Sequence, residues 1–318
     1  MTTVAENKGI AVVVPSHNHE RYIATCLRSI MKQSLPPAHL LVIDDGSTDQ
    51  SPKQISSILN DCPFPSELIV RENRGLSATL NQGLSLTRGE YFAYLSSDDL
   101  WLPGFLMART QSLATRPAAV LGYGHAYFVD ADNNIVDCTG DWAVYLDGDA
   151  RPMLLRAVGP MSPTVLYRRS FLEQFGWNEK VRLEDYELYL KLSTVGEFAF
   201  DEHVLSAWRW HDANTSRNQT MMLEEHLAAL AAMAPQLGLD AAQLTKLRRS
   251  VSFCRAEDFC RVGDIKTAKR LLIENMTAAS PGALFRTVAR VLLPHNIQMT
   301  MRQRKQKLKT RHLGKIDI

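Results

Sequence analysis

Three clusters of polar and acidic residues each come after a short apolar run. Ser16–Asn18 follow IAVVV, the segment DDGS at 44–47 follows LLVI, and the segment SSDD at 96–99 follows YFAYL. Adjacent carboxylates repel each other unless a cation or hydrogen-bond donors compensate. Hard oxygen ligands of this kind suit Mg²⁺ or Mn²⁺, and such an ion can bridge a diphosphate.

Each acidic pair also has a purely structural interpretation, because aspartate caps helices and favours turns. Taken singly, Asp44-Asp45 and Asp98-Asp99 are therefore not diagnostic. Two acidic turns at one edge of a sheet would be an unusual coincidence. Neither GxGxxG nor GxxxxGK[ST] occurs, so the phosphate cradles of a dinucleotide fold and of a P-loop are both missing.

The apolar runs alternate with helical patterns along the first hundred residues. The predicted strands are residues 10–14, 40–43, 68–70 and 91–95. Strand–helix alternation with short polar links builds a parallel sheet, and ligands of such sheets collect at the carboxyl ends of the strands. The three polar clusters are therefore predicted to share one edge of the sheet. Further on, residues 184–192 are predicted to be helical, and residues 221–275 to form two or three helices.

Composition indicates an ordinary globular chain. Of 318 residues, 45% are hydrophobic and 22% charged, with a formal net charge of +2. The charge is uneven, since no acid lies between Glu274 and Asp317, a stretch rich in Lys and Arg. No secretion signal or membrane-spanning run is expected. The five cysteines show no CxxC spacing and are expected to be buried thiols in a reducing compartment.

Several segments, in a fixed order over roughly residues 10–217, resemble family 2 glycosyltransferases with the GT-A fold. They are VVVPSHNHERYIATCLRSIMKQS, LLVIDDGSTDQS, ENRGLSATLNQGL, GEYFAYLSSDDLWLPGFL, FGWNEKVRLEDYELYLKLSTVGEF and WRWHDANTSR. The resemblance implies an α/β fold with a Rossmann-like, mostly parallel central sheet flanked by helices. We expect a catalytic domain at 1–217, a helical extension at 218–282 and a basic amphipathic tail at 283–318.

The resemblance also implies roles for single residues in binding a nucleotide-sugar donor. Those expected along the base, the ribose and the phosphates are Pro15, Ser16, His17, Asp45, Asn73, Arg74, Ser97 and Arg209. Asp98 and His211 are the expected ligands of Mn²⁺ or Mg²⁺. The family pattern is Asp-x-Asp, and Ser96 stands at its first position. Asp99 is either part of this pair or a cap of the helix expected at LWLPGFL.

Glu184-Asp185 resembles the family pair in which the aspartate is the catalytic base. An inverting transfer is a single displacement at the anomeric carbon, so one base must deprotonate the acceptor hydroxyl. Asp185 is the expected base, and Glu184 is expected to bind the acceptor or to orient Asp185. The alternative is that Asp185 is simply an acid favoured at a helix start. Trp101, Trp142 and Trp177 are expected to pack in the core or to line an acceptor groove.

The basic tail combines an apolar helix, residues 283–293, with a following cationic cluster. This pattern is typical of an anchor on an anionic membrane surface. A solvated charged helix, a helix packed on residues 221–275 and a dimer contact remain open alternatives. Nucleic-acid binding is not expected, because the basic stretch lacks interleaved aromatic residues.

Together with these residue patterns, the resemblance implies a metal-dependent inverting glycosyltransferase. UDP is the expected nucleotide, with dTDP and GDP left open. The expected acceptor is a hydroxyl of a glycan or lipid-linked glycan, as in the assembly of O-antigen or capsule. The expected location is the cytoplasm, at the inner face of the cell membrane. The alternatives are a nucleotidyltransferase, which SHNHER after the first strand disfavours, and an inactive GT-A-fold binding module, which Ser96 favours.

Overall fold

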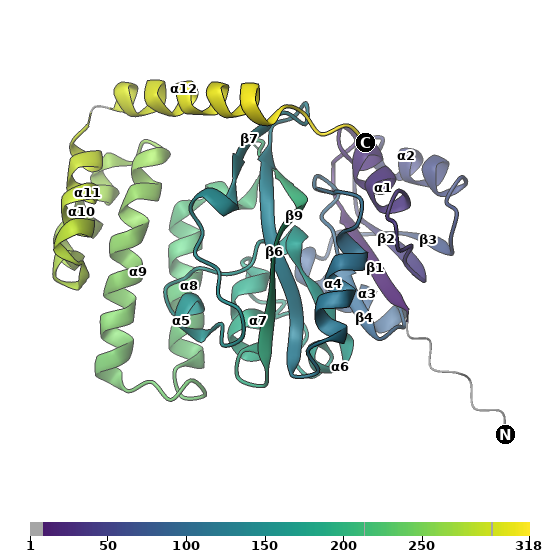
Figure 1. Ribbon diagram of the computed structural model, residues 1–318, viewed down its shortest axis with the longest axis horizontal. Helices are drawn as coiled ribbons and strands as arrows, with labels where there is room; N and C mark the ends of the chain where they lie inside the picture. The colour runs from purple at the N-terminus through teal and green to yellow at the C-terminus, as the bar shows by residue number, and fades with distance from the viewer. Residues whose placement is uncertain (1–8, 213, 294) are drawn as a thin grey trace.

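One curled sheet forms the centre of the structure, a computed structural model that describes residues 9–212, 214–293 and 295–318 (Figure 1). Residues 1–8 of the expected catalytic domain thus lie outside the described residues. The strand order is β3-β2-β1-β4-β8-β6-β9-β5, with β7 paired to β6. Most of the paired residues lie in parallel ladders, which confirms the predicted fold class.

The first four strands follow the sequence prediction closely. They are β1 (Ile10–Ser16), β2 (His39–Asp45), β3 (Ser66–Arg71) and β4 (Tyr91–Tyr94), all parallel. Alternate side chains of β1 enter different cores, because successive residues of a strand point to opposite faces. Val12 and Val14 pack on the side of α1 (Ile23–Met31) and α2 (Ser51–Leu59). Val13 packs on the side of α3 (Leu76–Leu86), so helices cover both faces.

The second half of the sheet is mixed. Its strands are β5 (Leu100–Trp101), β6 (Ala119–Val129), β7 (Ile135–Cys138), β8 (Leu166–Arg168) and β9 (Glu197–Arg209). Its helices are α4 (Phe105–Ala114), α5 (Arg151–Leu154), α6 (Arg169–Leu172) and α7 (Glu184–Leu192). The expectation that Asp99 caps a helix is wrong. Residues 100–101 form a strand, and α4 begins only at Phe105, after Gly104.

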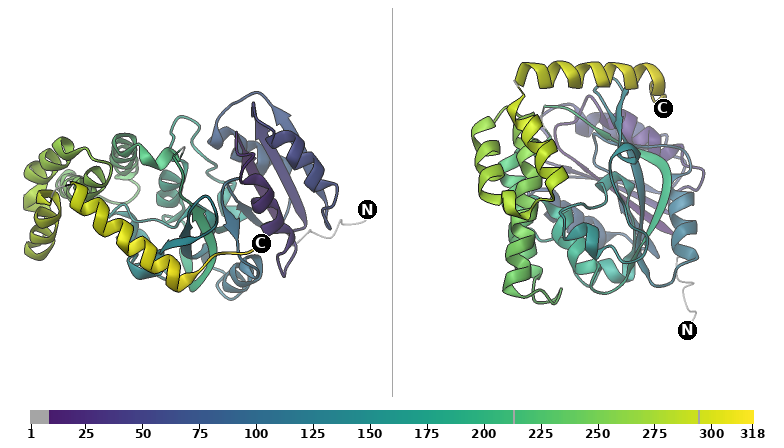
Figure 2. Two further views of the ribbon diagram at one scale, coloured as in Figure 1. Left: turned by 90° about the horizontal axis from the view of Figure 1, so that it is seen from above. Right: turned by 60° about the vertical axis from the view of Figure 1, so that its left-hand side comes forward.

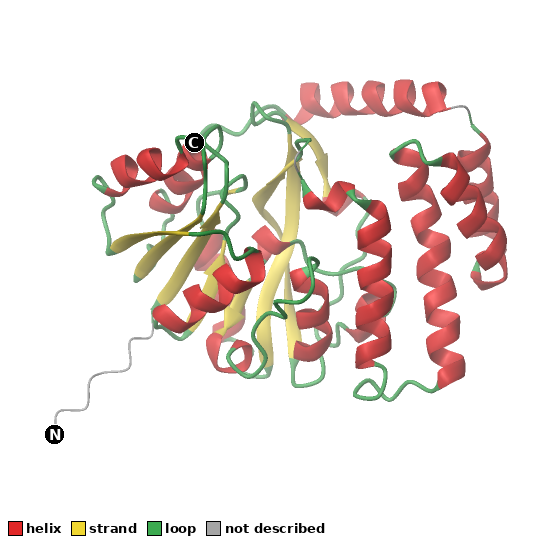
Figure 3. Ribbon diagram, turned by 180° about the vertical axis from the view of Figure 1, so that it is seen from behind, coloured by secondary structure: helices red, strands yellow, loops and turns green. Residues whose placement is uncertain are grey.

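A helical region lies to one side of the sheet (Figures 1 and 3). It contains α8 (Gln219–Met233), α9 (Ala241–Arg261), α10 (Ile265–Asn275) and α11 (Pro281–Leu292). The boundary expected at residue 283 falls inside α11, which packs against α9 and α10. Thr287 is buried there, and its hydroxyl donates to Glu257 Oε1 at 2.9 Å.

The last helix, α12 (His295–Leu313), crosses from this region back to the sheet (Figures 1 and 2). It ends beside β7, where Thr310 Oγ1 donates to the carbonyl of Ile135 at 2.9 Å. Among the described residues, no helix combines the length and the apolar character that crossing a bilayer requires. All five cysteines are free. Cys26, Cys138 and Cys260 are buried as expected, whereas Cys62 is half-buried and Cys254 is exposed.

Candidate functional site

Three side chains from distant parts of the chain meet at the carboxyl edge of the sheet. Asp98 follows β4, His211 follows β9, and His19 lies in the turn before α1. His211 Nε2 is 2.8 Å from Asp98 Oδ2, and His19 Nδ1 is 3.9 Å from Asp98 Oδ1. One ligand atom from each residue lies within 4.8 Å of the others, so the three can hold one metal ion. We call them the His–Asp–His cluster.

The charge on this cluster is set by its surroundings. Burial opposes ionisation of Asp98. The hydrogen bond from His211, and the positive charge that His19 carries when it is protonated, outweigh burial and lower the pKa of Asp98. Burial and the Asp98 charge raise the pKa of Asp99 well above its usual range. Burial lowers the pKa of His19, which favours the neutral imidazole that metals require. The cluster therefore offers one carboxylate and a neutral ring.

Arg209 is buried directly behind the cluster. Its Nε donates to the Asp98 carbonyl at 2.7 Å and its Nη1 to the Asp130 carbonyl at 2.7 Å. Its Nη2 donates to Asn133 Oδ1 at 2.6 Å, and its guanidinium lies 4.8 Å from the centre of the Tyr22 ring. The structure thus places Arg209 behind Asp98, with its guanidinium bonded to protein acceptors, whereas the sequence suggested contact with a diphosphate.

The residues expected at the nucleobase surround the ends of β1, β2 and β3. His17 Nδ1 donates to the Asp45 carbonyl at 2.9 Å. The Asp45 carboxylate accepts from the backbone amides of Arg74 (2.9 Å) and Gly75 (2.8 Å), and it pairs with Arg71 at 2.9 Å. Asp45 therefore fixes the turn that presents Asn73 and Arg74, whose side chains are exposed.

Pro15, Ser16 and Ser97 lie deeper at the same edge and are buried. Ser97 Oγ is 2.8 Å from His19 Nδ1, so it orients a ring of the His–Asp–His cluster. Ser16 Oγ is buried without a hydrogen-bond partner among the described residues. The structure thus brings the predicted donor-site residues and the predicted metal ligands to one edge.

The predicted base sits at the first turn of α7, close to the end of β4. The Tyr94 hydroxyl donates to Asp185 Oδ1 at 2.6 Å and approaches Glu184 Oε1 at 3.4 Å. Burial raises the pKa of Asp185 to about 7, although the Tyr94 hydrogen bond acts in the opposite direction. Burial and the Asp185 charge raise the pKa of Glu184 well above its usual range. A carboxylate poised near neutrality is suited to take up a proton.

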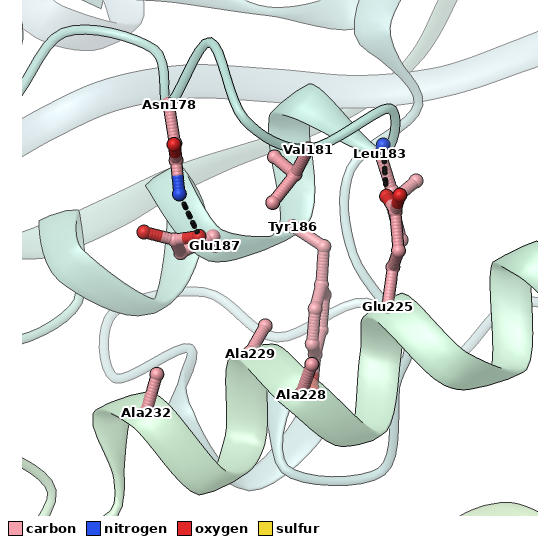
Figure 4. A pocket seen from close by; sticks show the side chains of 9 residues that line it. All are labelled: Asn178, Val181, Leu183, Tyr186, Glu187, Glu225, Ala228, Ala229 and Ala232. Atoms are coloured by element: carbon pink, nitrogen blue, oxygen red, sulfur yellow. Dashed lines mark hydrogen bonds between the residues drawn. The ribbon is translucent and has the colours of Figure 1, made fainter.

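The loop that leads into α7 is held by a carboxylate from α8. Glu225 accepts hydrogen bonds from the backbone amides of Arg182, at 3.0 and 2.9 Å, and of Leu183. Beside it lies a pocket of about 230 Å³ between α7 and α8 (Figure 4). Its wall combines Glu225 and Glu187 with small apolar side chains of α8. Glu225 thus fixes the backbone immediately before Glu184 and Asp185.

Sequence reasoning missed four residues of this site, namely His19, Tyr22, Tyr94 and Glu225. A second histidine two residues after His17 was a usable signal for His19. Of the three tryptophans weighed for an acceptor groove, Trp101 and Trp177 are buried in the core. Trp142 is exposed and packs beside Phe128.

Comparison with known proteins decides the family. Residues 11–174, more than half of the chain, match the family model described as glycosyl transferase family 2. The chain belongs to this family. The Escherichia coli chondroitin synthase is 25% identical to this glycosyltransferase over 232 residues, which cover 72% of the chain and 33% of that protein. The putative glycosyltransferase EpsH of Bacillus subtilis is 28% identical over 173 residues, covering 53% of the chain and 49% of that protein. The chain thus spans between a third and a half of the length of these two relatives.

Solved structures show that this glycosyltransferase has the GT-A fold. S. aureus TarS 1–349 in complex with UDP-GlcNAc superposes with a TM-score of 0.60 at 18% identity, over 95% of this chain and 89% of that one. The mannosyltransferase PcManGT from Pyrobaculum calidifontis, in complex with GDP-Man and Mn²⁺, gives a TM-score of 0.62 at 18% identity, over 96% and 88%.

Proposed function

We propose that this glycosyltransferase transfers a sugar from a nucleotide-sugar donor to a hydroxyl of a glycan or lipid-linked glycan, with inversion at the anomeric carbon. One observation carries the proposal: the end of β4 positions both the proposed base and a proposed metal ligand. Tyr94, its last residue, holds Asp185, and four residues later Asp98 belongs to the His–Asp–His cluster. A base and a cation site therefore lie at one strand end, as a displacement with a diphosphate leaving group requires.

In the proposed reaction, Asp185 accepts the proton of the acceptor hydroxyl as that oxygen attacks the anomeric carbon. Its pKa of about 7 leaves a large ionised fraction near neutral pH, and its basicity then exceeds that of an ordinary aspartate. Tyr94 orients the carboxylate by donating to Oδ1. We assign Glu184 to the acceptor side, where a protonated carboxyl can donate to a sugar hydroxyl.

The donor set of the His–Asp–His cluster fits a divalent metal. His19, Asp98 and His211 would hold it, and its charge would stabilise the leaving nucleoside diphosphate. Two imidazole nitrogens suit Mn²⁺ better than Mg²⁺, which prefers oxygen ligands. We therefore propose Mn²⁺, and the Mn²⁺ bound in the mannosyltransferase neighbour supports this choice.

For the donor we propose a UDP-sugar, bound by the turns that carry His17, Asp45, Asn73 and Arg74. UDP-GlcNAc in one structural neighbour supports UDP, while GDP-Man in another keeps GDP as the main competitor. The chondroitin synthase relatives support a role in polysaccharide synthesis. We propose the assembly of a surface polysaccharide such as O-antigen or capsule.

We further propose that the protein works at the cytoplasmic face of a membrane and binds it through α12. Ile297, Met301 and Leu308 are exposed, and their spacing places them on one side of this helix. Arg304, Lys307 and Arg311 are exposed on the same helix. Apolar side chains flanked by cations fit an anionic lipid surface.

A panel of nucleotide sugars, scored for release of the nucleoside diphosphate, tests the proposed function. We expect release from one UDP-sugar with Mn²⁺, and little release with a chelator. The acceptors would be a glycan and a lipid-linked glycan. Equal release with chelator would overturn the metal assignment, and release from a GDP-sugar alone would overturn UDP. Specific nucleotide binding with no release under any condition would indicate a binding module.

A further inference from the structure

Residues 314–316 return from α12 to the turn between β6 and β7, far from them in sequence. The amide of Ile135 donates to the Gly314 carbonyl at 3.0 Å, and the amide of Ile316 donates to the Asn133 carbonyl at 3.0 Å. Between these bonds, Asn134 and Lys315 form an antiparallel bridge. We call residues 314–316 the return strand.

Apolar packing and ion pairs hold the return strand in place. Ile316 is buried in a small core with Leu100, Val129, Ile135 and Ala207. One turn before the end of α12, Lys309 Nζ pairs with Asp137 and lies 2.6 Å from Asp141 Oδ2. The return strand is therefore packed and paired against the rest of the fold, although its sequence shows no strand pattern.

The β6–β7 turn, which pairs with the return strand, also forms a hydrogen bond with Arg209. Asn133 accepts both bonds: its backbone carbonyl accepts from the amide of Ile316, and its side-chain oxygen accepts from Arg209 Nη2 at 2.6 Å. Its φ of 67° is a left-handed conformation that asparagine tolerates better than most residues. Arg209 in turn donates to the carbonyl of Asp98 at 2.7 Å.

We propose that the return strand is a positioning element of the His–Asp–His cluster, acting through Asn133 and Arg209. It fixes the β6–β7 turn, the turn fixes the guanidinium, and the guanidinium fixes the backbone of Asp98. Arg209 also donates its own amide to Asp99 Oδ1 at 2.8 Å, and it lies two residues before His211. Through its side chain and its backbone amide, Arg209 therefore connects both strand ends that supply the cluster. That the cluster binds a metal is part of the proposed function, and this inference rests on it.

Two variants separate this role from general stability. Ending the chain at Leu313 removes the return strand, and its control ends the chain at Ile316, which leaves the paired residues in place. Asn133→Gly removes the acceptor for Arg209 but keeps the left-handed φ, because glycine adopts it freely. Its control is Asp132→Gly in the same turn, where the exposed Asp132 side chain pairs only with exposed Arg21 in the described structure.

The experiment is a calorimetric titration of Mn²⁺ into each full variant in the presence of UDP. Loss of groups that orient metal ligands costs about 10–100-fold in metal affinity, so we expect both test variants to bind Mn²⁺ at least roughly tenfold more weakly. Both controls should bind it like the parent. Unchanged Mn²⁺ affinity in Asn133→Gly and in the chain ending at Leu313 would overturn the proposal.

A second readout keeps this test separate from the metal assignment. The ring carbon–proton NMR signals of His19 and His211, recorded in chelator at fixed pH, report the cluster without metal. We expect them to move in both test variants and to stay in place in both controls. If the parent binds no Mn²⁺ but the signals move as expected, the metal proposal fails and the positioning role stands. If the signals do not move, the positioning role fails.

Discussion

The hydroxyl of Tyr94, at the end of β4, donates to Asp185 Oδ1 at the start of α7 across 2.6 Å. This bond favours the ionised carboxylate, whereas burial, the larger effect, favours the protonated form. The balance leaves the pKa of Asp185 at about 7. The pH at which the proposed base becomes active is therefore set by burial and lowered by one phenol hydrogen bond.

Replacing Tyr94 by phenylalanine should move the acid limb of the pH–rate profile upward. Loss of the donor raises the pKa of Asp185 further, so the rise of kcat/KM should shift by about one pH unit, equivalent to about 1.4 kcal/mol. The matched control is Tyr167→Phe, because the hydroxyl of this buried tyrosine makes no hydrogen bond to Asp185 in the described structure. It should leave the limb near pH 7, and a shared shift would show that the Asp185 bond is not responsible.

Asp185→Asn should remove most turnover, on the order of 10²-fold or more, while UDP binding persists. It should also stabilise the protein at pH 8. The folded-state pKa is raised from 3.8 to about 7, so ionisation costs stability progressively as the pH rises through this interval. Asparagine avoids that cost, and Tm at pH 8 should rise by roughly 2 °C or more. At pH 4 the gain should vanish. A variant with parental turnover would rule out Asp185 as the base.

Each member of the His–Asp–His cluster should contribute to Mn²⁺ affinity. We expect Asp98→Asn, His19→Gln and His211→Gln to weaken binding by roughly tenfold or more, since even loss of groups outside the ligand shell costs that much. His203→Gln is the control, because His203 is exposed and pairs with Asp201 away from the cluster. Calorimetry with UDP present measures the effect. If His19→Gln binds like the control, the ligands are only Asp98 and His211.

Glu225→Ala should loosen the loop before α7. Two backbone amides lose a charged acceptor, so the free energy of unfolding should fall by about 1–3 kcal/mol. Because that loop leads directly to Asp185, kcat should fall more than KM rises. Glu224→Ala, the exposed neighbour on α8, should change neither quantity. Urea unfolding and steady-state kinetics on both variants measure these quantities. Equal unfolding free energies and equal kcat values in the two variants would contradict the role of Glu225.

Replacing Arg304, Lys307 and Arg311 together by glutamine should weaken binding to anionic vesicles by about 3 kcal/mol, because each cation near the surface contributes about 1 kcal/mol. Binding by the parent should weaken as salt rises, through screening over about 8–10 Å. Point variants are preferable to deletion of residues 283–318, since deletion would also expose α9 and remove the return strand. Co-sedimentation with anionic and neutral vesicles measures the effect. No difference between the two lipids would contradict the membrane proposal.

Local patterns were sufficient to predict the parallel half of the sheet and the edge at which the polar clusters meet. The run VVV of β1 is buried on both faces, and the acidic turns follow strands whose ends the fold brings together. The helix at 184–192 was predicted with the bounds that the structure shows. Such features depend on neighbours in sequence, which composition and periodicity describe well.

Apart from His19, the missed features depend on contacts between distant segments. Nothing near Tyr94 in sequence indicates that its hydroxyl faces Asp185, and nothing near Glu225 indicates a backbone partner at Leu183. Arg209 was expected at a phosphate because the segment WRWH at 208–211 resembles a family segment that contains an arginine and a histidine. Its burial against Asp130 and Asn133 follows from the pairing of β9 with β6, which no local pattern encodes.

The buried indole of Trp177 is a fluorophore close to the proposed base. Trp177 is buried with its ring edge-on to Tyr94, at 5.8 Å between centroids, and Tyr94 is the residue that binds Asp185. Indole emission is sensitive to the orientation and polarity of neighbouring groups. Only the Tyr94 side chain separates Asp185 from this indole. The chain has five tryptophans. Rapid-mixing fluorescence of a variant that keeps Trp177 alone is therefore the way to follow the protonation of this carboxylate.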